Sequence, residues 1–304
     1  MKLKGAKITG QIDVTGARFD GTLDADSLQV GGDLKMQSDD QNEASFKDVK
    51  LNGAKITGDS QLGGPKSAIR AEENGEPWTL YLRNTQIGNL VDAKYAWPVK
   101  GQLHLDGFSF NHLGGSEGDT GQEMRDRGMG WWDKDWARRD PEYSPTPYAQ
   151  LAAAFTSAGD RNATNEIRYL GRERERDEAW RQGKLGSWLF LTALSYIAGY
   201  GIGSYTFRVL YWVLGFSLAG AALLWWTVPA ARTEHRGKLW CFGASLARLL
   251  PVIEINKEFT EFFNDPERTR LSWWQSIVFA AIGVVGWVLG AVLVAAVSGL
   301  TQSV

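Results

Sequence analysis

The sequence predicts a multidomain membrane protein with an N-terminal β-helix-like repeat domain, a helical hairpin and a C-terminal two-transmembrane-helix domain. Three observations support this prediction. The first third of the chain repeats with a period of 11 residues. Of the 68 charged side chains, 54 lie in residues 1–185 and only 14 in residues 186–304. The second part also contains two uncharged runs, of 23 and 34 residues. Because 304 residues exceed what one hydrophobic core normally holds, we expect several structural units.

The repeat is visible in both identity and spacing. Residues 3–10 read LKGAKITG and residues 51–58 read LNGAKITG, which agree at seven of eight positions. Apolar residues recur 11 positions apart within this region, as do glycines. Short alternating strands at a fixed period are typical of stacked β-helix coils, here with two units in a coil of about 22 residues. We therefore expect residues 1–112 to form such coils, with these side chains inside: Ile8, Ile12, Phe19, Leu23, Val30 and Leu34.

A β-sandwich is the alternative for this region, because its strands also recur about every 8–12 residues. Sandwich strands do not repeat side-chain identity so closely, and this favours the β-helix. Later coils are recognisable in residues 79–93 and 102–110, where apolar and polar residues alternate.

Two segments of different composition follow the repeats. Residues 113–145 are rich in glycine and charge and are interpreted as a linker, although they contain the tryptophans 131, 132 and 136. Residues 146–184 predict a cytoplasmic helical hairpin, in which Gly159 ends the first helix and Asp160 caps the second. The alternating charges of RERERDEAWR (residues 172–181) indicate a solvated helix face with ion pairs one turn apart.

The two uncharged runs, residues 209–231 and 271–304, are long enough to cross a membrane. A hydrocarbon core of about 30 Å needs about 20 helical residues. Two buried helices of a soluble core are the alternative, but globular helices rarely extend past about 20 residues without a polar face. Aromatic residues also stand where interfacial anchors are expected: Tyr211, Trp212, Trp225, Trp226, Trp273 and Trp274.

Two shorter apolar segments have other interpretations. Residues 185–204 predict an interfacial helix, because their apolar part is too short to span and three alternating glycines interrupt its end. A third crossing is the alternative for this segment. Residues 205–304 then form the two-span membrane domain, in which the segment 239–255 has the length of a re-entrant or interfacial helix.

The expected orientation places the N-terminal part in the cytoplasm. No positively charged, apolar leader begins at Met1, so nothing in the sequence predicts export of residues 1–185. Two crossings return the C-terminus to the same side, and the loop 232–270 then faces outward.

Composition and motifs exclude several classes of function. The formal charge of −2 argues against a nucleic-acid-binding protein, and the single Cys241 excludes a disulfide framework or a Cys-ligated zinc site. No G-x-G-x-x-G sequence opens a helix after a strand. His104, Asp106 and His112 offer at most a weak metal site, and solvated side chains are the better interpretation. We therefore expect neither enzymatic activity nor a cofactor or metal ion.

The order of motifs resembles a known family. The segments GAKITGQIDVTGARFDGTLD, LDGFSF, PYAQLAAAF, IAGYGIGSYTFRVLYW and SLARLLPVIEI follow one another, before an apolar helix that begins with tryptophan. Together they resemble bacterial membrane-anchored β-helix (pentapeptide-like repeat) proteins with a C-terminal two-span tail, some of which are labelled "membrane-associated oxidoreductase". The five-residue pattern itself is not kept here. The resemblance implies a place in the bacterial inner membrane and a tail like the minimal two-span pore architecture, whereas the oxidoreductase label has no counterpart in the residues.

The segment between the two spans predicts an ion path. A short apolar helix is broken at Pro251 and followed by Glu254 and Asn256, so a ring of carboxylates at the mouth of a path would favour cations. An interfacial helix with Glu254 in water is the alternative. Two spans cannot enclose a pore alone, so conduction requires an oligomer. Small residues for close helix packing are present, namely Gly286, Gly290, Gly215 and Ala219.

The sequence thus predicts an oligomeric, cation-permeable membrane channel with a cytoplasmic β-helical domain that regulates or assembles it. Its expected partners are membrane lipids, other copies of the chain, and a cytoplasmic protein or small-molecule regulator. The alternative is a non-conducting membrane-tethered scaffold whose β-helix binds a partner.

Overall fold

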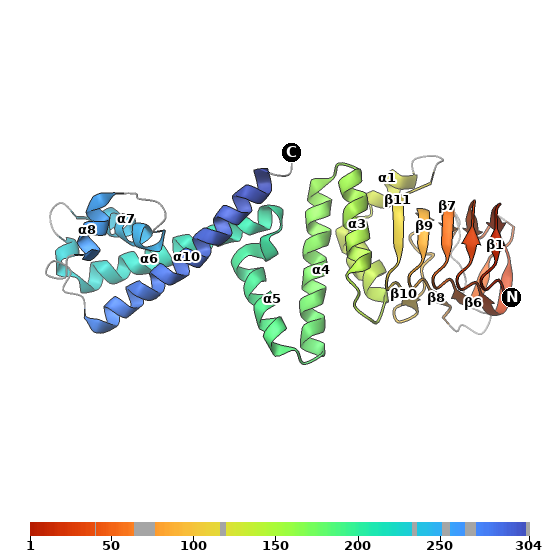
Figure 1. The fold of residues 1–304 in the computed structure, drawn as a ribbon, viewed down its shortest axis with the longest axis horizontal. Coiled ribbons are helices and arrows are strands. Elements are labelled where there is room, and N and C mark those ends of the chain that lie inside the picture. Colours follow the sequence, from red (N-terminus) through yellow and green to blue (C-terminus); the bar gives the residue numbers. More distant parts are fainter. Residues whose placement is uncertain are drawn as a thin grey trace. The chain divides into compact units, whose positions relative to one another are not determined.

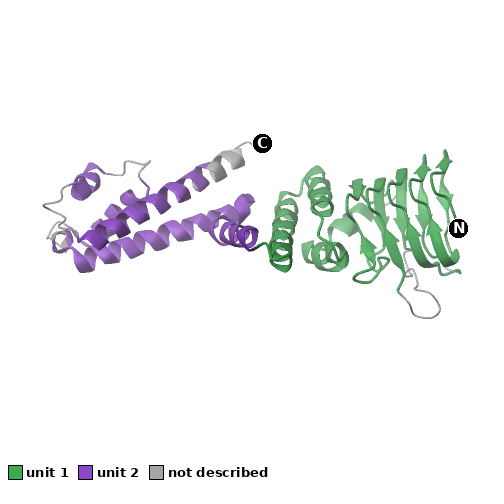
Figure 2. Ribbon diagram, turned by 60° about the horizontal axis from the view of Figure 1, so that its bottom comes forward, with its two compact units in different colours: residues 1–184 green, residues 185–304 purple. Residues whose placement is uncertain are grey.

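The computed structural model describes residues 1–39, 41–63, 77–115, 120–232, 236–250, 256–264 and 272–301. Its contacts divide the chain into two compact units, residues 1–184 and residues 185–304 (Figure 2). Every strand of the described residues lies in unit 1, and unit 2 is helical. The boundary between the units coincides with the change in charge density that the sequence displays.

Unit 1 begins with a β-solenoid of about four turns (Figure 1). Its strands stack in two sheets, and every pairing between described strands is parallel. Parallel pairing rules out the β-sandwich alternative, which needs antiparallel neighbours. One sheet contains β1 (Lys7–Ile8), β2 (Ile12–Asp13), β4 (Gln29–Val30), β5 (Leu34–Met36), β7 (Lys55–Leu62), β9 (Gln86–Asp92) and β11 (Ser109–Leu113). The other contains β3 (Arg18–Asp24), β6 (Ser45–Lys50), β8 (Thr79–Tyr81) and β10 (Leu103–His104).

The strand register confirms the period read from the sequence. Ile8 pairs with Val30 in the first sheet, 22 positions on, and Phe19, midway between them, lies in the second sheet. Each unit of 11 residues therefore supplies one face of a coil. The next two coils are longer, since Gln29 pairs with Lys55 and Lys55 with Gln86, whereas Gln86 pairs with Ser109, 23 positions on.

Inward side chains stack on their equivalents in the next coil. Phe19 stacks on Phe46 with 5.5 Å between ring centroids, and Phe46 lies 6.1 Å from Trp78. Of the six residues predicted inside, Leu23, Val30 and Leu34 are buried, whereas Ile8, Ile12 and Phe19 are only partly buried. These last three belong to the first coil, where a neighbouring coil covers them on one side only.

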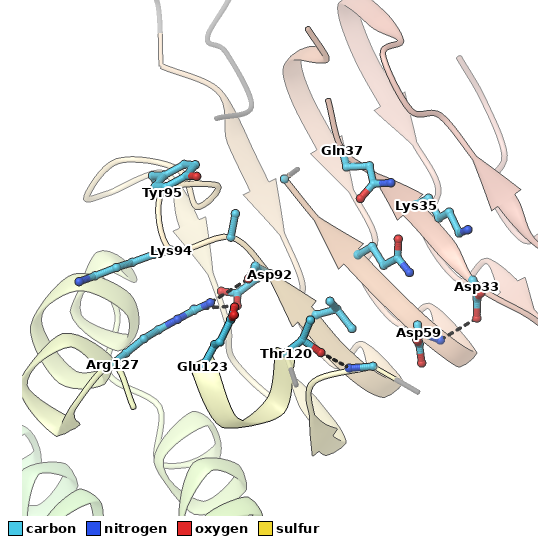
Figure 3. A pocket seen from close by; sticks show the side chains of 15 residues that line it. Asp33, Lys35, Gln37, Asp59, Asp92, Lys94, Tyr95, Thr120, Glu123 and Arg127 are labelled. Carbon is cyan, nitrogen blue, oxygen red and sulfur yellow. Dashed lines mark hydrogen bonds and ion pairs between the residues drawn. The ribbon is translucent and has the colours of Figure 1, made fainter. Parts of the chain in front are cut away.

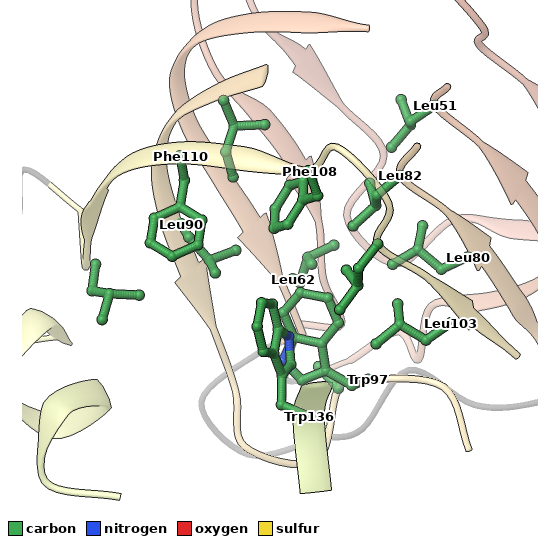
Figure 4. Close-up of a cluster of buried hydrophobic side chains, with 14 of the residues drawn as sticks. Leu51, Leu62, Leu80, Leu82, Leu90, Trp97, Leu103, Phe108, Phe110 and Trp136 are labelled. Atoms are coloured by element: carbon green, nitrogen blue, oxygen red, sulfur yellow. The ribbon is translucent and has the colours of Figure 1, made fainter. Parts of the chain in front are cut away.

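The segment interpreted as a linker, residues 113–145, instead packs into the core of unit 1 over its described residues, 113–115 and 120–145. Trp132 and Trp136 are fully buried. Trp136 packs against Trp97 and Phe108 of the solenoid, with centroid separations of 5.6 and 6.4 Å (Figure 4). The large apolar area of three tryptophans outweighs the glycine and charge content that suggested a linker. The segment forms α1 (Thr120–Arg125), α2 (Met129–Trp131), a π-helical turn (Trp132–Trp136) and a 3-10 turn (Ala137–Arg139).

A helical hairpin ends unit 1 (Figure 1). It consists of α3 (Thr146–Ser157) and α4 (Arg161–Arg181), and the Asp160 side chain accepts a hydrogen bond from the Ala163 amide as the N-cap of α4. Arg174, in the charged run of α4, is buried and donates hydrogen bonds to the carbonyl oxygens of Asp140 and Glu142. The run is therefore not solvated throughout, because one arginine joins α4 to the preceding segment.

Unit 2 contains two helices that are long and apolar enough to cross a membrane, by length and composition. A short helix of 14 residues precedes them, and it is separated from the first by a break at Gly199–Gly201, where Tyr200 has a φ of 59°. The helices among its described residues are α5 (Leu185–Ala198), α6 (Arg208–Thr227), α7 (Lys238–Leu249), α8 (Lys257–Asn264) and α10 (Trp273–Thr301), with 3-10 turns at Gly203–Phe207 and Pro229–Arg232.

Candidate functional site

The first candidate site is formed by α6, α7 and α10 in unit 2. The short α7 packs against both long helices, and the long helices also contact each other. One face of α7 is buried, and its residues follow helical spacing: Cys241, Ala244, Ser245 and Leu249. At 1.5 Å per residue the 12 residues of α7 extend over about 18 Å, less than the ~30 Å hydrocarbon core of a bilayer.

Glycines allow α7 to approach its neighbours closely. A Cβ atom on Gly286 of α10 would lie 1.6 Å from the carbonyl oxygen of Leu249, at the C-terminal end of α7. A Cβ atom on Gly220 of α6 would lie 2.1 Å from the Ser245 hydroxyl oxygen. At Gly286 the obstacle is backbone, so only glycine fits there, whereas at Gly220 the Ser245 side chain would have to turn away. The Gly286 contact thus fixes how closely α7 approaches α10.

A cation fixes the N-terminal end of α7. The Arg236 guanidinium lies over the rings of Trp240 and Phe262, 4.7 and 5.1 Å from their centroids. It also pairs with the Glu258 carboxylate of α8 at 3.3 Å. Stacking of this kind contributes about 0.5–1 kcal/mol where it is exposed and more where it is desolvated. Arg236 thus joins the start of α7 to α8.

The residues predicted for the ion path and for oligomer packing differ in their surroundings. Glu254 lies outside the described residues. Asn256 is exposed, and its side-chain oxygen accepts a hydrogen bond from the Glu258 amide at the start of α8. Gly286 already contacts α7 of its own chain, whereas Gly215 and Ala219 lie on the exposed face of α6 and Gly290 is half-buried. Packing between copies of the chain stays a prediction for all four small residues.

A second candidate site is a groove of about 700 Å³ on the outer face of the solenoid (Figure 3). The stacked coils place equivalent polar residues in a column along it. The Asp33 carboxylate accepts a hydrogen bond from the Asp59 amide at 2.9 Å, and the Asp59 carboxylate accepts one from the Asn89 side chain at 2.7 Å. Lys35 pairs in register with Gln61, so the next column carries an amine and an amide.

The α1 segment forms the opposite wall of this groove, where Glu123 is exposed. At the base, Arg127 pairs with the Asp92 carboxylate at 2.7 Å, and its guanidinium stacks over Trp131 at 4.8 Å. The Trp97 indole also donates a hydrogen bond to Asp92. Burial raises the pKa of Asp92, and the ion pair with Arg127 opposes this increase. The pair is a structural support for the groove rather than a free reactive group.

The histidines considered as a metal site do not come together. His104 lies on β10 in one sheet, and His112 lies on β11 in the other. The His104 ring stacks on Tyr81 at 4.6 Å, and burial, followed by the charge of Arg83, lowers its pKa from 6.5.

Comparison of the chain with protein-family models, with curated proteins and with solved structures finds no match in any of the three.

Sequence reasoning missed three of these features. Arg236 contacts Phe262, more than 20 positions further along the segment between the two long helices. No short sequence motif marks this contact. The groove depends on coil register and on α1, which lies in the segment that composition predicts to be a linker. The sequence shows Gly286 only as part of a G-x-x-x-G pattern. Such a pattern indicates that some helix packs closely there, but it does not identify α7 and Leu249 as the partner.

Proposed function

We propose that this chain is an oligomeric, cation-permeable membrane channel with a solenoid domain that regulates or assembles it. The observation that supports the proposal best is the position of α7. It is a helix too short to cross a bilayer, and it is held against two helices that are long enough to do so. A re-entrant element between two spans is where a narrow path is built in a two-span oligomer.

The surface of the long helices supports membrane insertion. In an apolar stretch of 18 residues within each candidate span, only 28% of the stretch is buried inside the chain. A core helix of a soluble protein would be mostly buried. The outward side chains are large and apolar, among them Leu214, Leu218, Val284, Trp287 and Val288. Such surfaces need lipid or another copy of the chain to cover them.

The preference for cations is inferred from two features near the end of α7. The C-terminal end of a helix carries a partial negative charge of about half an electron, because its last carbonyl groups lack partners. Glu254 follows that end in the sequence. If several copies surround one axis, these negative charges attract cations and repel anions. We further propose that residues 1–185 and the C-terminus face the cytoplasm of a bacterial cell and that the loop 232–270 faces outward.

The oligomeric state of the purified full chain in detergent tests this proposal. Single-particle images that show a ring of four or more copies with an axial opening support the channel. A monomer or a dimer contradicts it.

The groove favours a second candidate function, a non-conducting scaffold tethered to the membrane. A groove of about 700 Å³ with carboxylates, amides and amines is the kind of surface that holds a polar partner. A monomeric chain that still binds a cytoplasmic protein through this groove would favour the scaffold over the channel. Lys35→Glu, which reverses a charge on the groove wall, should then weaken binding, while Lys4→Glu on the exposed first coil should not.

A further inference from the structure

Unit 2 carries a groove of about 590 Å³ between α6 and α7. Of the nine described residues that line it, eight are apolar, including Leu214 and Leu218 of α6 and Leu239 and Phe242 of α7. The exception is Lys238, the first residue of α7. An apolar surface of this size with a single cation suits a molecule with a long apolar part and one anionic end.

Among the described lining residues, the charged one lies at one end of the groove. The Lys238 ammonium lies over the Trp225 ring, 5.9 Å from its centroid, and Trp226 lines the same end. Leu214 lies at the other end, 11 residues earlier in α6, which corresponds to about 16 Å along a helix. Tryptophan and lysine are typical of the membrane interface, and leucine of the hydrocarbon region. The groove therefore has the polarity gradient of one bilayer leaflet.

We infer that this groove binds an acyl chain of an anionic phospholipid, whose phosphate group is bound by Lys238. The inference rests on the membrane insertion of unit 2 proposed above, but not on conduction. Among the described residues that line the groove, Lys238 is the one cation, and it is exposed. The nearby Arg236 lies outside the lining, where it pairs with Glu258 and stacks on Trp240. No carboxylate lines the groove within the described residues, and a zwitterionic headgroup would offset its own phosphate charge.

One lysine near an anionic lipid surface favours binding by about fivefold. We therefore expect the full chain to bind phosphatidylglycerol about fivefold more tightly than phosphatidylcholine with the same acyl chains. Lys238→Gln should abolish this preference. Lys257→Gln removes another exposed lysine, in α8, which does not line the groove, and should leave the preference unchanged.

The test uses the full chain in nanodiscs of phosphatidylcholine with a phosphatidylglycerol that carries a photoreactive group on its acyl chain. Cross-links on Leu214, Leu218 or Phe242 that unlabelled phosphatidylglycerol displaces better than phosphatidylcholine support the inference. Equal displacement by both lipids overturns it, as does a preference that survives Lys238→Gln. Cross-links on another face of α6 or α10, or a groove filled by a second copy of the chain, overturn it as well. If carbonate washing removes the chain from membranes, unit 2 is not inserted, and both the channel and the lipid site are wrong. The other negative results overturn the lipid site alone and do not affect the channel proposal.

Discussion

Replacing Gly286 with alanine should detach α7 from the long helices. The added methyl group would lie 1.6 Å from the Leu249 carbonyl oxygen, well below the 3.0 Å that real Cβ atoms respect. Because the obstacle is backbone, no side-chain rotation relieves it, and α7 and α10 must move apart. Overpacking of this kind costs about 1–3 kcal/mol.

The single cysteine provides the assay. Cys241 is fully buried on the inner face of α7, so a thiol reagent reaches it when α7 opens. If labelling follows the opening equilibrium, a cost of 1–3 kcal/mol corresponds to labelling about 5–150 times faster. The rate is measured on the full chain in detergent, with a fluorogenic maleimide at constant pH.

Gly290→Ala is the matched control. It lies one turn further along α10, and its nearest atom would be 4.0 Å away, so it gains the same helix propensity without the clash. Its labelling rate should equal that of the original chain. If Gly286→Ala is labelled as slowly as Gly290→Ala, the close contact between α7 and α10 is wrong.

Three further predictions concern the solenoid and the topology. Phe46→Ala should lower the free energy of unfolding of unit 1 by about 3–5 kcal/mol in urea titrations, and Phe19→Ala by clearly less, because Phe46 is fully buried and Phe19 is only partly buried at the end of the stack. Equal losses would contradict this stacking. Because the pKa of His104 is lowered in the folded state, the unfolded chain takes up its proton first, and stability should fall as the pH decreases from about 7 to 5. His104→Gln should reduce that loss in the same titrations, and an unchanged pH dependence would refute the assignment. A cysteine at Ser303, with Cys241 replaced, should resist impermeant thiol reagents in intact cells, whereas rapid labelling would indicate an odd number of crossings.

The register of the repeats could be predicted from the sequence, because residues one coil apart in a stacked fold pair with each other. Ile8 and Val30 are 22 positions apart, and the structure pairs them. The same reasoning failed for residues 113–145, where composition suggested a linker. Trp132 and Trp136 are fully buried, which a linker does not allow. Trp136 packs against Trp97 and Phe108, which are distant in the sequence, so composition alone does not reveal the contact.

In unit 2 the sequence predicted which helices are long and apolar, because length and composition alone decide that. It could not predict which faces meet. Gly286 and Gly290 look equivalent in a G-x-x-x-G pattern, yet only Gly286 lies against the Leu249 carbonyl oxygen. The position of Lys238 over Trp225 also depends on the turn between α6 and α7, which no periodicity determines.

The central claim is that this chain conducts cations as an oligomer. Current across a planar bilayer that contains the purified full chain, under a potassium chloride gradient, tests it most directly. We expect discrete currents whose reversal potential follows the potassium gradient. Glu254→Gln should move that potential toward zero, while Glu258→Gln and Glu261→Gln should not. Absence of current at every voltage and pH, or a reversal potential that follows chloride, would refute cation conduction by this chain.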